Sequence, residues 1–379
     1  MDFILFIVII IITACSSPKQ QNTEGFYVID LEQCFNSKQQ LLISEIADTL
    51  EYIILKTPQD VVVADIRSVV PFGDYMFVIS KGNLYKFLRD GSFVKKIGSQ
   101  GRGPGEYTSA RSVNIDKYRG EIIISDLNQI LFYSMEGIFL RSQMLRSFSF
   151  TISDSVIWSA NYPGFWQEFQ AISYSTSADT ISFIRNRGFD RTKIAGGFNV
   201  VTSKIVAPFY SHKGSIFYKG FEDNDTIWTI SGSVAKPHAY INMGRYKLPY
   251  EYAPGTRSYT EHSSDYLGIP LIFEDDNFFF FKTENRGSSE SKYLAYDKNK
   301  RNGFIIKDEK NMGLTDDLLG GPNIRLLWSS DDYFISIYEG LELLEDIELG
   351  RHSPVPAFQE QLSTITGDTN QLIVLCQKK

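Results

Sequence analysis

The sequence predicts an all-β fold, a six-bladed β-propeller of four-stranded blades whose ring is closed by N-terminal and C-terminal strands. Three observations support this prediction: an aromatic-rich composition, a repeat of about 45 residues, and a strongly apolar segment near each end of the chain. The 379 residues include 28 Phe, 21 Tyr and 4 Trp, and these residue types favour pleated, half-buried strands. The length suits one large β architecture.

The repeat is clearest in two stretches, residues 65–98 and 110–141. Each contains four short apolar segments separated by Asp-Gly, Glu-Gly or Asn turns, which are typical of hairpins. Arg67 and Arg111 occupy matching positions 44 residues apart, and Gly91 and Gly137 lie 46 residues apart. Four-stranded units at about this period are typical of propeller blades.

The rest of the chain repeats the same order of strands with a weaker pattern. The expected strands are 147–153, 156–161, 169–176 and 180–185 in the third unit, 205–210, 215–219, 226–231 and 234–243 in the fourth, 271–274, 278–283, 293–297 and 303–307 in the fifth, and 324–329 and 333–338 in the sixth. Residues 341–366 interrupt this pattern, and a proline before residues 357–362 indicates a short surface helix over 355–362.

The sixth unit lacks two strands, and the chain ends can supply them. Residues 371–376 predict a buried C-terminal strand, and residues 51–56 predict an N-terminal strand outside the first unit. Their pairing would close the ring and remove exposed sheet edges, which otherwise favour aggregation. We therefore expect residues 26–379 to form one propeller domain.

The N-terminal segment is predicted to be an export signal. Residues 3–14 are an almost continuous apolar run of 12 residues, whereas a membrane-spanning helix needs about 20. The ending Ile12-Thr13-Ala14-Cys15 resembles the lipobox of bacterial lipoproteins, which implies a signal peptide over 1–14, lipid on Cys15 and a lipidated tether over 15–25. A plain secretory signal or a buried N-terminal strand are the alternatives.

Charge and cysteine content limit the other interpretations. The formal net charge of −7 argues against a broad nucleic-acid-binding surface, so no nucleic-acid partner is expected. Besides Cys15, the chain has Cys34 and Cys376 near its ends, and two buried free thiols are favoured over a disulfide. The four histidines, His212, His238, His262 and His352, lack the spacing of a zinc site, so we expect no metal and no cofactor.

Two resemblances follow from the motifs. Residues 97–107, 122–126 and 132–137 resemble an NHL repeat, although Asn128-Gln-Ile-Leu lacks the basic residue of that repeat. The lipobox, residues 42–57, the glycine-rich loop and the closing segment 372–375 resemble the six-bladed β-propeller lipoproteins of Bacteroides-type bacteria. The resemblance implies a propeller in the cell envelope, expected at the outer membrane, and implies no particular reaction.

The candidate ligand-binding residues are arginines. Arg67, Arg111 and Arg325 open the first strand of units one, two and six, which are consecutive in a closed ring, and Arg102 lies on the loop between units one and two. First strands line a propeller's channel, and the planar guanidinium suits carboxylate or sulfate groups. We therefore expect an anionic ligand, with arginines that only pair with neighbouring acids as the alternative.

No catalytic residues are identified. Gly101-Arg-Gly-Pro-Gly-Glu106 fails the phosphate-loop and dinucleotide templates and is interpreted as an inter-blade turn. The acidic stretches 274–276, 316–317 and 331–332 are interpreted as hairpin turns.

The favoured function is therefore a lipid-anchored module of the cell envelope that binds a glycan, a peptide or an envelope protein and contacts the membrane through the lipid on Cys15. The alternatives are a propeller enzyme with an axial active site acting on a lactone, glycan or peptide, and a purely structural subunit.

Overall fold

The computed structural model describes residues 26–379 apart from residues 127, 146, 148, 161–167, 187–206, 221–224, 250–251, 253–261, 287–289, 307–312, 367–368 and 370. The predicted signal peptide, Cys15 and the tether lie outside the described residues. None of the described helices is long and apolar enough to cross a membrane.

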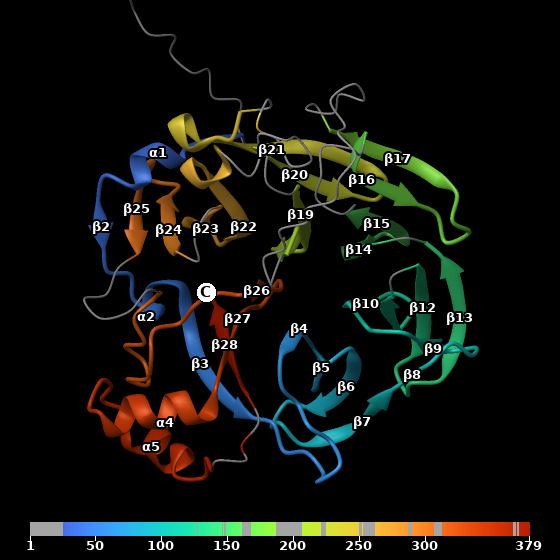
Figure 1. Cartoon of the computed structure of the whole chain (residues 1–379), viewed down its shortest axis with the longest axis horizontal. Coiled ribbons are helices and arrows are strands. Elements are labelled where there is room, and N and C mark those ends of the chain that lie inside the picture. The colour runs from blue at the N-terminus through green and yellow to red at the C-terminus, as the bar shows by residue number, and fades with distance from the viewer. Residues whose placement is uncertain are drawn as a thin grey trace, which may run out of the picture.

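Six small sheets form a closed ring, so the predicted six-bladed β-propeller is confirmed (Figure 1). Blades 1 to 3 have four antiparallel strands each: β4 (Ile66–Phe72), β5 (Tyr75–Ser80), β6 (Asn83–Leu88) and β7 (Phe93–Ile97); β10 (Ser112–Asp116), β11 (Glu121–Ser125), β12 (Gln129–Ser134) and β13 (Phe139–Met144); β14 (Ser149–Ser153), β15 (Val156–Ala160), β16 (Phe169–Tyr174) and β17 (Thr180–Arg185).

Blades 4 to 6 complete the ring. Their strands are β18 (Phe209–His212), β19 (Ser215–Lys219), β20 (Thr226–Ser231) and β21 (Val234–Asn242); β22 (Leu267–Glu274), β23 (Phe278–Asn285), β24 (Ser291–Asp297) and β25 (Asn302–Ile306); β26 (Trp328–Ser329), β27 (Tyr333–Tyr338), β28 (Leu372–Lys378) and β3 (Ala47–Ile54). Short 3-10 helices, η2 (Gly244–Tyr246) and η4 (Ser263–Asp265), lie between blades 4 and 5 in the sequence.

Blade 6 is built from both ends of the chain, as the sequence predicted. The C-terminal strand β28 lies between β27 and the N-terminal strand β3, with Leu372 opposite Ile54 and Val374 opposite Tyr52. The side chains of Leu372, Ile373, Val374 and Leu375 are almost completely buried. This pairing joins the two ends of the chain in one sheet and closes the ring (Figure 1).

Blades 4 and 5 differ from the prediction because each gains a fifth strand. β1 (Tyr27–Asp30) pairs in parallel with β21, and β2 (Lys38–Gln39) pairs in parallel with β25. With α1 (Leu31–Cys34), α2 (Ile43–Ile46) and β3, these elements form an N-terminal strap, residues 27–54, along the outer edges of blades 4, 5 and 6. Strands of four and two residues are too short for a recognisable alternation of apolar side chains.

Two helices lie outside blade 6, between β27 and β28. The predicted helix over 355–362 is present as α5 (Pro356–Leu362), whereas α4 (Gly340–Glu348) was not predicted. Both follow the loss of the strand pattern after β27 and lie beside the blade (Figure 1).

The glycine-rich loop is an inter-blade turn, as predicted. Its two short segments β8 (Ser99–Gln100) and β9 (Glu106–Tyr107) pair in parallel. The buried Tyr107 donates its hydroxyl hydrogen bond to Ile97 O at 2.8 Å and accepts one from Leu84 N at 3.1 Å. This tyrosine therefore fastens the loop to blade 1.

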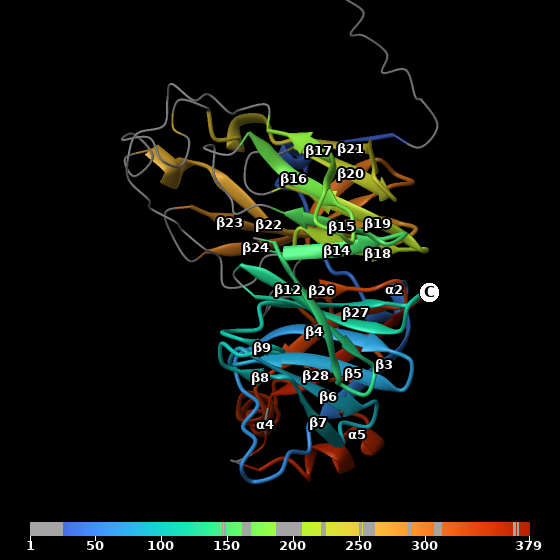
Figure 2. The ribbon, with the colours of Figure 1, turned by 90° about the vertical axis from the view of Figure 1, so that its right-hand side faces the viewer.

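Each blade presents its first strand to the centre of the ring (Figure 1). We call the face where these inner strands begin the start face, and the face where they end and enter their first hairpins the turn face. The C-terminal end of β28 lies on one face of the ring when it is viewed from the side (Figure 2), and the contacts described below show that this is the turn face.

Candidate functional site

On the turn face, blades 4 and 6 contact each other although blade 5 separates them in the sequence. Lys378 Nζ donates to Ser211 O at 3.2 Å, and Gly214 N donates to Asp331 Oδ1 at 3.0 Å. Ser329 Oγ lies 3.5 Å from Ser211 O. We call these five residues the turn-face latch, because they join the ends of the inner strands β18 and β26.

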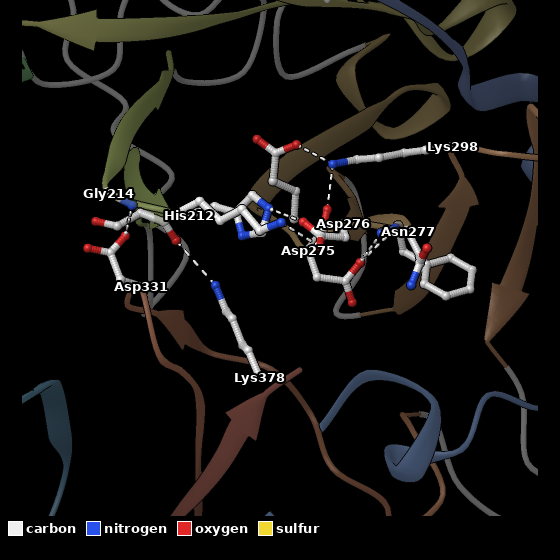
Figure 3. A network of polar contacts seen from close by, with 12 residues as sticks. His212, Gly214, Asp275, Asp276, Asn277, Lys298, Asp331 and Lys378 are labelled. Atoms are coloured by element: carbon white, nitrogen blue, oxygen red, sulfur yellow. Dashed lines mark hydrogen bonds and ion pairs between the residues drawn. The ribbon is translucent and has the colours of Figure 1, made fainter. Parts of the chain in front are cut away.

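Lys378 is the buried cation of this latch (Figure 3). Its ammonium donates to Ser329 Oγ at 2.8 Å and lies 4.5 Å from the centre of the Phe334 ring. Burial lowers the pKa of Lys378 to about 8, although the nearby Asp275 and Asp331 oppose this shift. The pKa is therefore close enough to neutrality for Lys378 to change its charge in mildly alkaline solution.

Blade 5 contributes an acidic turn beside the latch (Figure 3). Asp276 contacts two residues of blade 4, with Oδ1 3.1 Å from His212 Nε2 and Oδ2 2.6 Å from Lys213 Nζ. Burial and the charge of Lys378 lower the pKa of His212. Asp275 shapes the turn itself, since its Oδ1 accepts hydrogen bonds from the backbone N–H of Asn277 and Phe278, both at 2.7 Å.

A buried carboxylate, Glu274, lies at the end of β22 behind this turn. It accepts hydrogen bonds from Lys298 Nζ at 2.6 Å and from Tyr210 Oη at 3.2 Å, and His238 Nε2 lies 3.1 Å from its Oε1. Burial alone would raise its pKa, but the hydrogen bond with His238 and the charge of Lys298 hold the pKa of Glu274 below its ordinary value. Glu274 is therefore a satisfied anion that links blades 4 and 5.

Most of the contacts made by these turn-face residues are structural links between blades. Their carboxylates are occupied by lysines, histidines and backbone N–H groups, and among the described residues no group of three His, Cys, Asp or Glu side chains could hold a metal ion. Asp275, Asp276 and Asp331 lie in hairpin turns, as predicted, but the contact between these turns was not predicted. The partners lie far apart in sequence, and only the closed ring brings them together.

The start face carries three of the predicted arginines in equivalent positions, each level with the end of its blade's second strand. Arg67 follows Ile66, which pairs with Ser80; Arg111 N donates to Ser125 O at 2.9 Å; the Arg325 guanidinium lies 5.9 Å from the centre of the Tyr338 ring. All three residues are exposed. Blades 6, 1 and 2, to which they belong, are consecutive around the ring.

Arg67 is the one of these arginines with a described carboxylate partner. Its Nε and Nη2 donate to Asp65 Oδ2 at 3.1 and 2.7 Å. Both side chains are about half exposed, with values of 46% and 56%, so water screens this pair and its contribution to stability is small. The Asp65 carboxylate is therefore a weak competitor for an anionic ligand at Arg67.

Arg102 is exposed on the glycine-rich loop between blades 1 and 2. The neighbouring Gly103 N donates to Glu106 Oε2 at 2.8 Å, so the loop folds around the Glu106 carboxylate. A Cβ atom at Gly101 would lie 1.9 Å from Glu106 Oε2, so a larger residue there would require the Glu106 side chain to move. The loop is thus an ordered turn that presents Arg102 to solvent.

Comparison with known proteins identifies a family and a shared fold. A family model described as "Domain of unknown function (DUF4934)" matches residues 26–377. A crystal structure of a Bacteroides fragilis protein described as an exported protein matches with a TM-score of 0.69 at 18% identity, over 94% of this chain and 99% of that chain. A member of the DUF4221 family from Bacteroides vulgatus matches with a TM-score of 0.48 at 12% identity, over 88% and 97% of the two chains. No curated protein matches the sequence.

Proposed function

We propose that this chain, which belongs to the DUF4934 family, is an exported and lipid-anchored β-propeller that binds an anionic ligand on its start face. The ligand class is an acidic glycan or a peptide carboxylate. The proposed anchor is a lipid on Cys15, and the proposed location is the cell envelope, at the outer membrane.

The observation that carries the proposal is the equivalent placement of Arg67, Arg111 and Arg325. These three exposed arginines occupy a row of equivalent positions on three consecutive blades, each level with the end of its blade's second strand. A guanidinium offers two parallel N–H donors to a carboxylate or sulfate, which gives both attraction and geometric selectivity. The exposed Arg102 on the adjoining loop would extend the row.

The proposed location rests on the N-terminal sequence and on the similar structure. The apolar run 3–14 followed by Cys15 is typical of an exported lipoprotein, and the Bacteroides fragilis protein with the same fold is described as exported. The ordered glycine-rich loop at the boundary of blades 1 and 2 also supports relating the blades to NHL repeats.

The test compares arginine variants in ligand binding. Purified protein is titrated calorimetrically with acidic oligogalacturonate, with its neutral methyl ester, and with a peptide carrying either a free or an amidated C-terminus. We expect binding to an acidic member of a pair, and a loss of at least about tenfold in affinity for the double variant Arg67→Ala/Arg111→Ala, since each charge-assisted hydrogen bond contributes about 1.5–3 kcal/mol.

A matched control separates binding from folding. Arg185 is also an exposed arginine with a carboxylate partner, since its Nη1 lies 2.6 Å from Glu168 Oε1, but it belongs to the outer strand of blade 3. Arg185→Ala should leave the affinity unchanged. Equal affinities of wild type and the folded double variant for every acidic ligand that binds would refute the arginine site.

A further inference from the structure

The direction of β1 shows on which face the N-terminal segment reaches the propeller. β21 begins at the hairpin after β20. In this hairpin, Gly232 N donates a hydrogen bond to Oγ of Ser153, the last residue of β14, at 3.0 Å. This hairpin therefore lies on the turn face. β1 runs parallel to β21, with Tyr27 opposite Ala239 and Asp30 opposite Asn242. β1 therefore runs from the turn-face side toward the start face.

The tether between the proposed lipid and the propeller is short. Eleven residues, 16–26, separate Cys15 from Tyr27. A fully extended chain spans at most about 3.3–3.6 Å per residue, so this segment reaches no more than about 40 Å. A short tether joined to the turn-face end of β1 favours an orientation in which this face is directed to the bilayer and the start face is directed away from it.

Blade 2 carries an exposed tip on the turn face that combines apolar and basic side chains with one exposed acid, Glu136. We define the blade 2 tip as the hairpin residues 117–120 together with the adjacent hairpin residues 135–138. Tyr118 is 72% exposed and Ile138 is 65% exposed, which makes them two of the three most exposed large apolar side chains among the described residues. Lys117 and Arg119 flank the tyrosine and are exposed as well.

The backbone of the blade 2 tip is held in place by local contacts. The buried Asp116 accepts hydrogen bonds at its Oδ1 from Tyr118 N and Arg119 N, at 3.0 and 3.1 Å. A Cβ atom at Gly120 would lie 4.0 Å from Met135 Cγ, so the two hairpins are neighbours. Lys95 of blade 1 adds a cation beside them, since its Nζ donates to Glu136 O at 2.8 Å.

We propose that the blade 2 tip is a membrane-contact site, in which Tyr118 and Ile138 enter the interfacial region of the bilayer and Lys117 and Arg119 contact anionic headgroups. Tyrosine favours this region because its ring is apolar and its hydroxyl can remain hydrated. Lysine and arginine near the surface are attracted by anionic lipids. This inference rests on the proposed lipid anchor at Cys15.

The third of the highly exposed apolar residues provides a matched control. Met144 is 76% exposed and ends β13, the strand that Ile138 precedes. It pairs with Gln129 at the start of β12, at the opposite end of the blade from the 135–138 hairpin. Met144 therefore lies toward the start face, and a membrane oriented as proposed would leave it in water.

The experiment places an environment-sensitive nitrobenzoxadiazole fluorophore at one position of the mature chain, through either Tyr118→Cys or Met144→Cys. Cys34 and Cys376 are buried and will not react under native conditions. One arm uses the acylated protein, and the other replaces Cys15 with serine and adds an N-terminal hexahistidine tag that binds nickel-chelating lipid. Both arms use vesicles of phosphatidylethanolamine with a minority of phosphatidylglycerol.

We expect a several-fold rise in fluorescence with a blue shift for the probe at position 118 and an unchanged signal for the probe at position 144. In the nickel-chelating arm, a water-like signal at position 118, or shielding at position 144 instead, would overturn the membrane-contact site. If only the acylated arm fails to associate with vesicles, the anchor at Cys15 is wrong and the membrane-contact site stands.

Discussion

Lys378 and Ser211 connect two blades that are not neighbours in the sequence, with Lys378 Nζ 3.2 Å from Ser211 O. Two other buried lysines make the same kind of link between adjacent blades. Lys86 Nζ donates to Met135 O at 2.9 Å, and Lys219 Nζ donates to Ile269 O at 3.0 Å. A hydrogen bond from a buried lysine to a backbone carbonyl of another blade is therefore a recurrent contact between blades in this ring.

The low pKa of Lys378 predicts a pH-dependent contribution to stability. Burial lowers the pKa from the ordinary value of 10.5 to about 8. Between these values the unfolded chain binds a proton on Lys378 that the folded chain has lost, so the free energy of unfolding rises with pH in this window. Below about pH 8, Lys378 is protonated in both states, and burial of its charge lowers the free energy of unfolding by the full amount of about 3 kcal/mol.

Urea unfolding from pH 7 to pH 10.5 can measure this contribution as the difference between wild type and Lys378→Met. The methionine variant should lack the rise that Lys378 gives the wild type. Lys300, whose side chain is 74% exposed, provides the control, and Lys300→Met should follow the wild-type profile. Parallel profiles for wild type and Lys378→Met would show that this lysine has no lowered pKa.

Glu274 should contribute strongly to stability because it is buried with its cation. Lys298 Nζ lies 2.6 Å from Glu274 Oε2, and both side chains are almost inaccessible to water. Glu274→Gln would leave the Lys298 ammonium without its carboxylate, and we expect a loss of about 3–5 kcal/mol in chemical denaturation. The double variant Glu274→Gln/Lys298→Met should recover part of this loss, since it removes the unpaired charge.

Asp276 is the matched control for Glu274. Its carboxylate also binds a lysine, at 2.6 Å from Lys213 Nζ, but the side chain is 51% exposed. Asp276→Asn should cost less than about 1 kcal/mol, as is usual for exposed ion pairs. Similar losses for Glu274→Gln and Asp276→Asn would contradict the assignment of a buried ion pair.

Gly91 tests the junction between blades 1 and 6. It has a φ of +83°, and a Cβ atom there would lie 2.1 Å from Ile54 O in β3. Gly91→Ala should therefore displace β3 and lower the free energy of unfolding, measured by thermal denaturation, by about 4 kcal/mol. Gly73 has a φ of +55° with no atom within 4 Å of its Cβ position, so Gly73→Ala should cost only the backbone penalty of about 1–2 kcal/mol. Equal losses would refute the steric contact.

Cys15→Ala tests the anchor independently of any ligand. If Cys15 carries lipid, the wild-type protein should partition into the detergent phase of a Triton X-114 extraction, because acyl chains contribute about 0.8 kcal/mol per buried methylene. The variant should be released or should accumulate as an uncleaved precursor. Cys34→Ala is the control and should leave partitioning unchanged. Normal membrane retention of Cys15→Ala would exclude lipidation at this residue.

The blade architecture could be predicted because its signals are local in the sequence. Alternating apolar residues and turn residues define the hairpins of blades 1 and 2, and the closing strand at 372–375 is apolar without interruption. The closure of blade 6 by the two chain ends could be predicted because the sixth unit lacked two strands. The equivalence of Arg67, Arg111 and Arg325 could be predicted because each lies in or shortly before the first strand of its unit, and their ligand remains a prediction.

The remaining features depend on contacts that no local pattern encodes. β1 and β2 attach to blades 4 and 5 through backbone pairing, which requires no particular side chains. The turn-face contacts combine residues as distant as Ser211 and Lys378, whose meeting depends on how far the inner strands of blades 4 and 6 reach toward the axis. A sequence shows that such residues are polar but not that they share one site.

The N-terminal strap has a consequence for the time course of folding. Tyr27 pairs with Ala239, Lys38 with Ile305 and Ile54 with Leu372, so the first part of the propeller to be synthesised binds to its last three blades. These segments have no sheet to join until blades 4, 5 and 6 exist, and contacts of such high sequence separation form slowly. The ring can therefore close only after blades 4, 5 and 6 have been synthesised, which makes the joining of the chain ends a late step of folding.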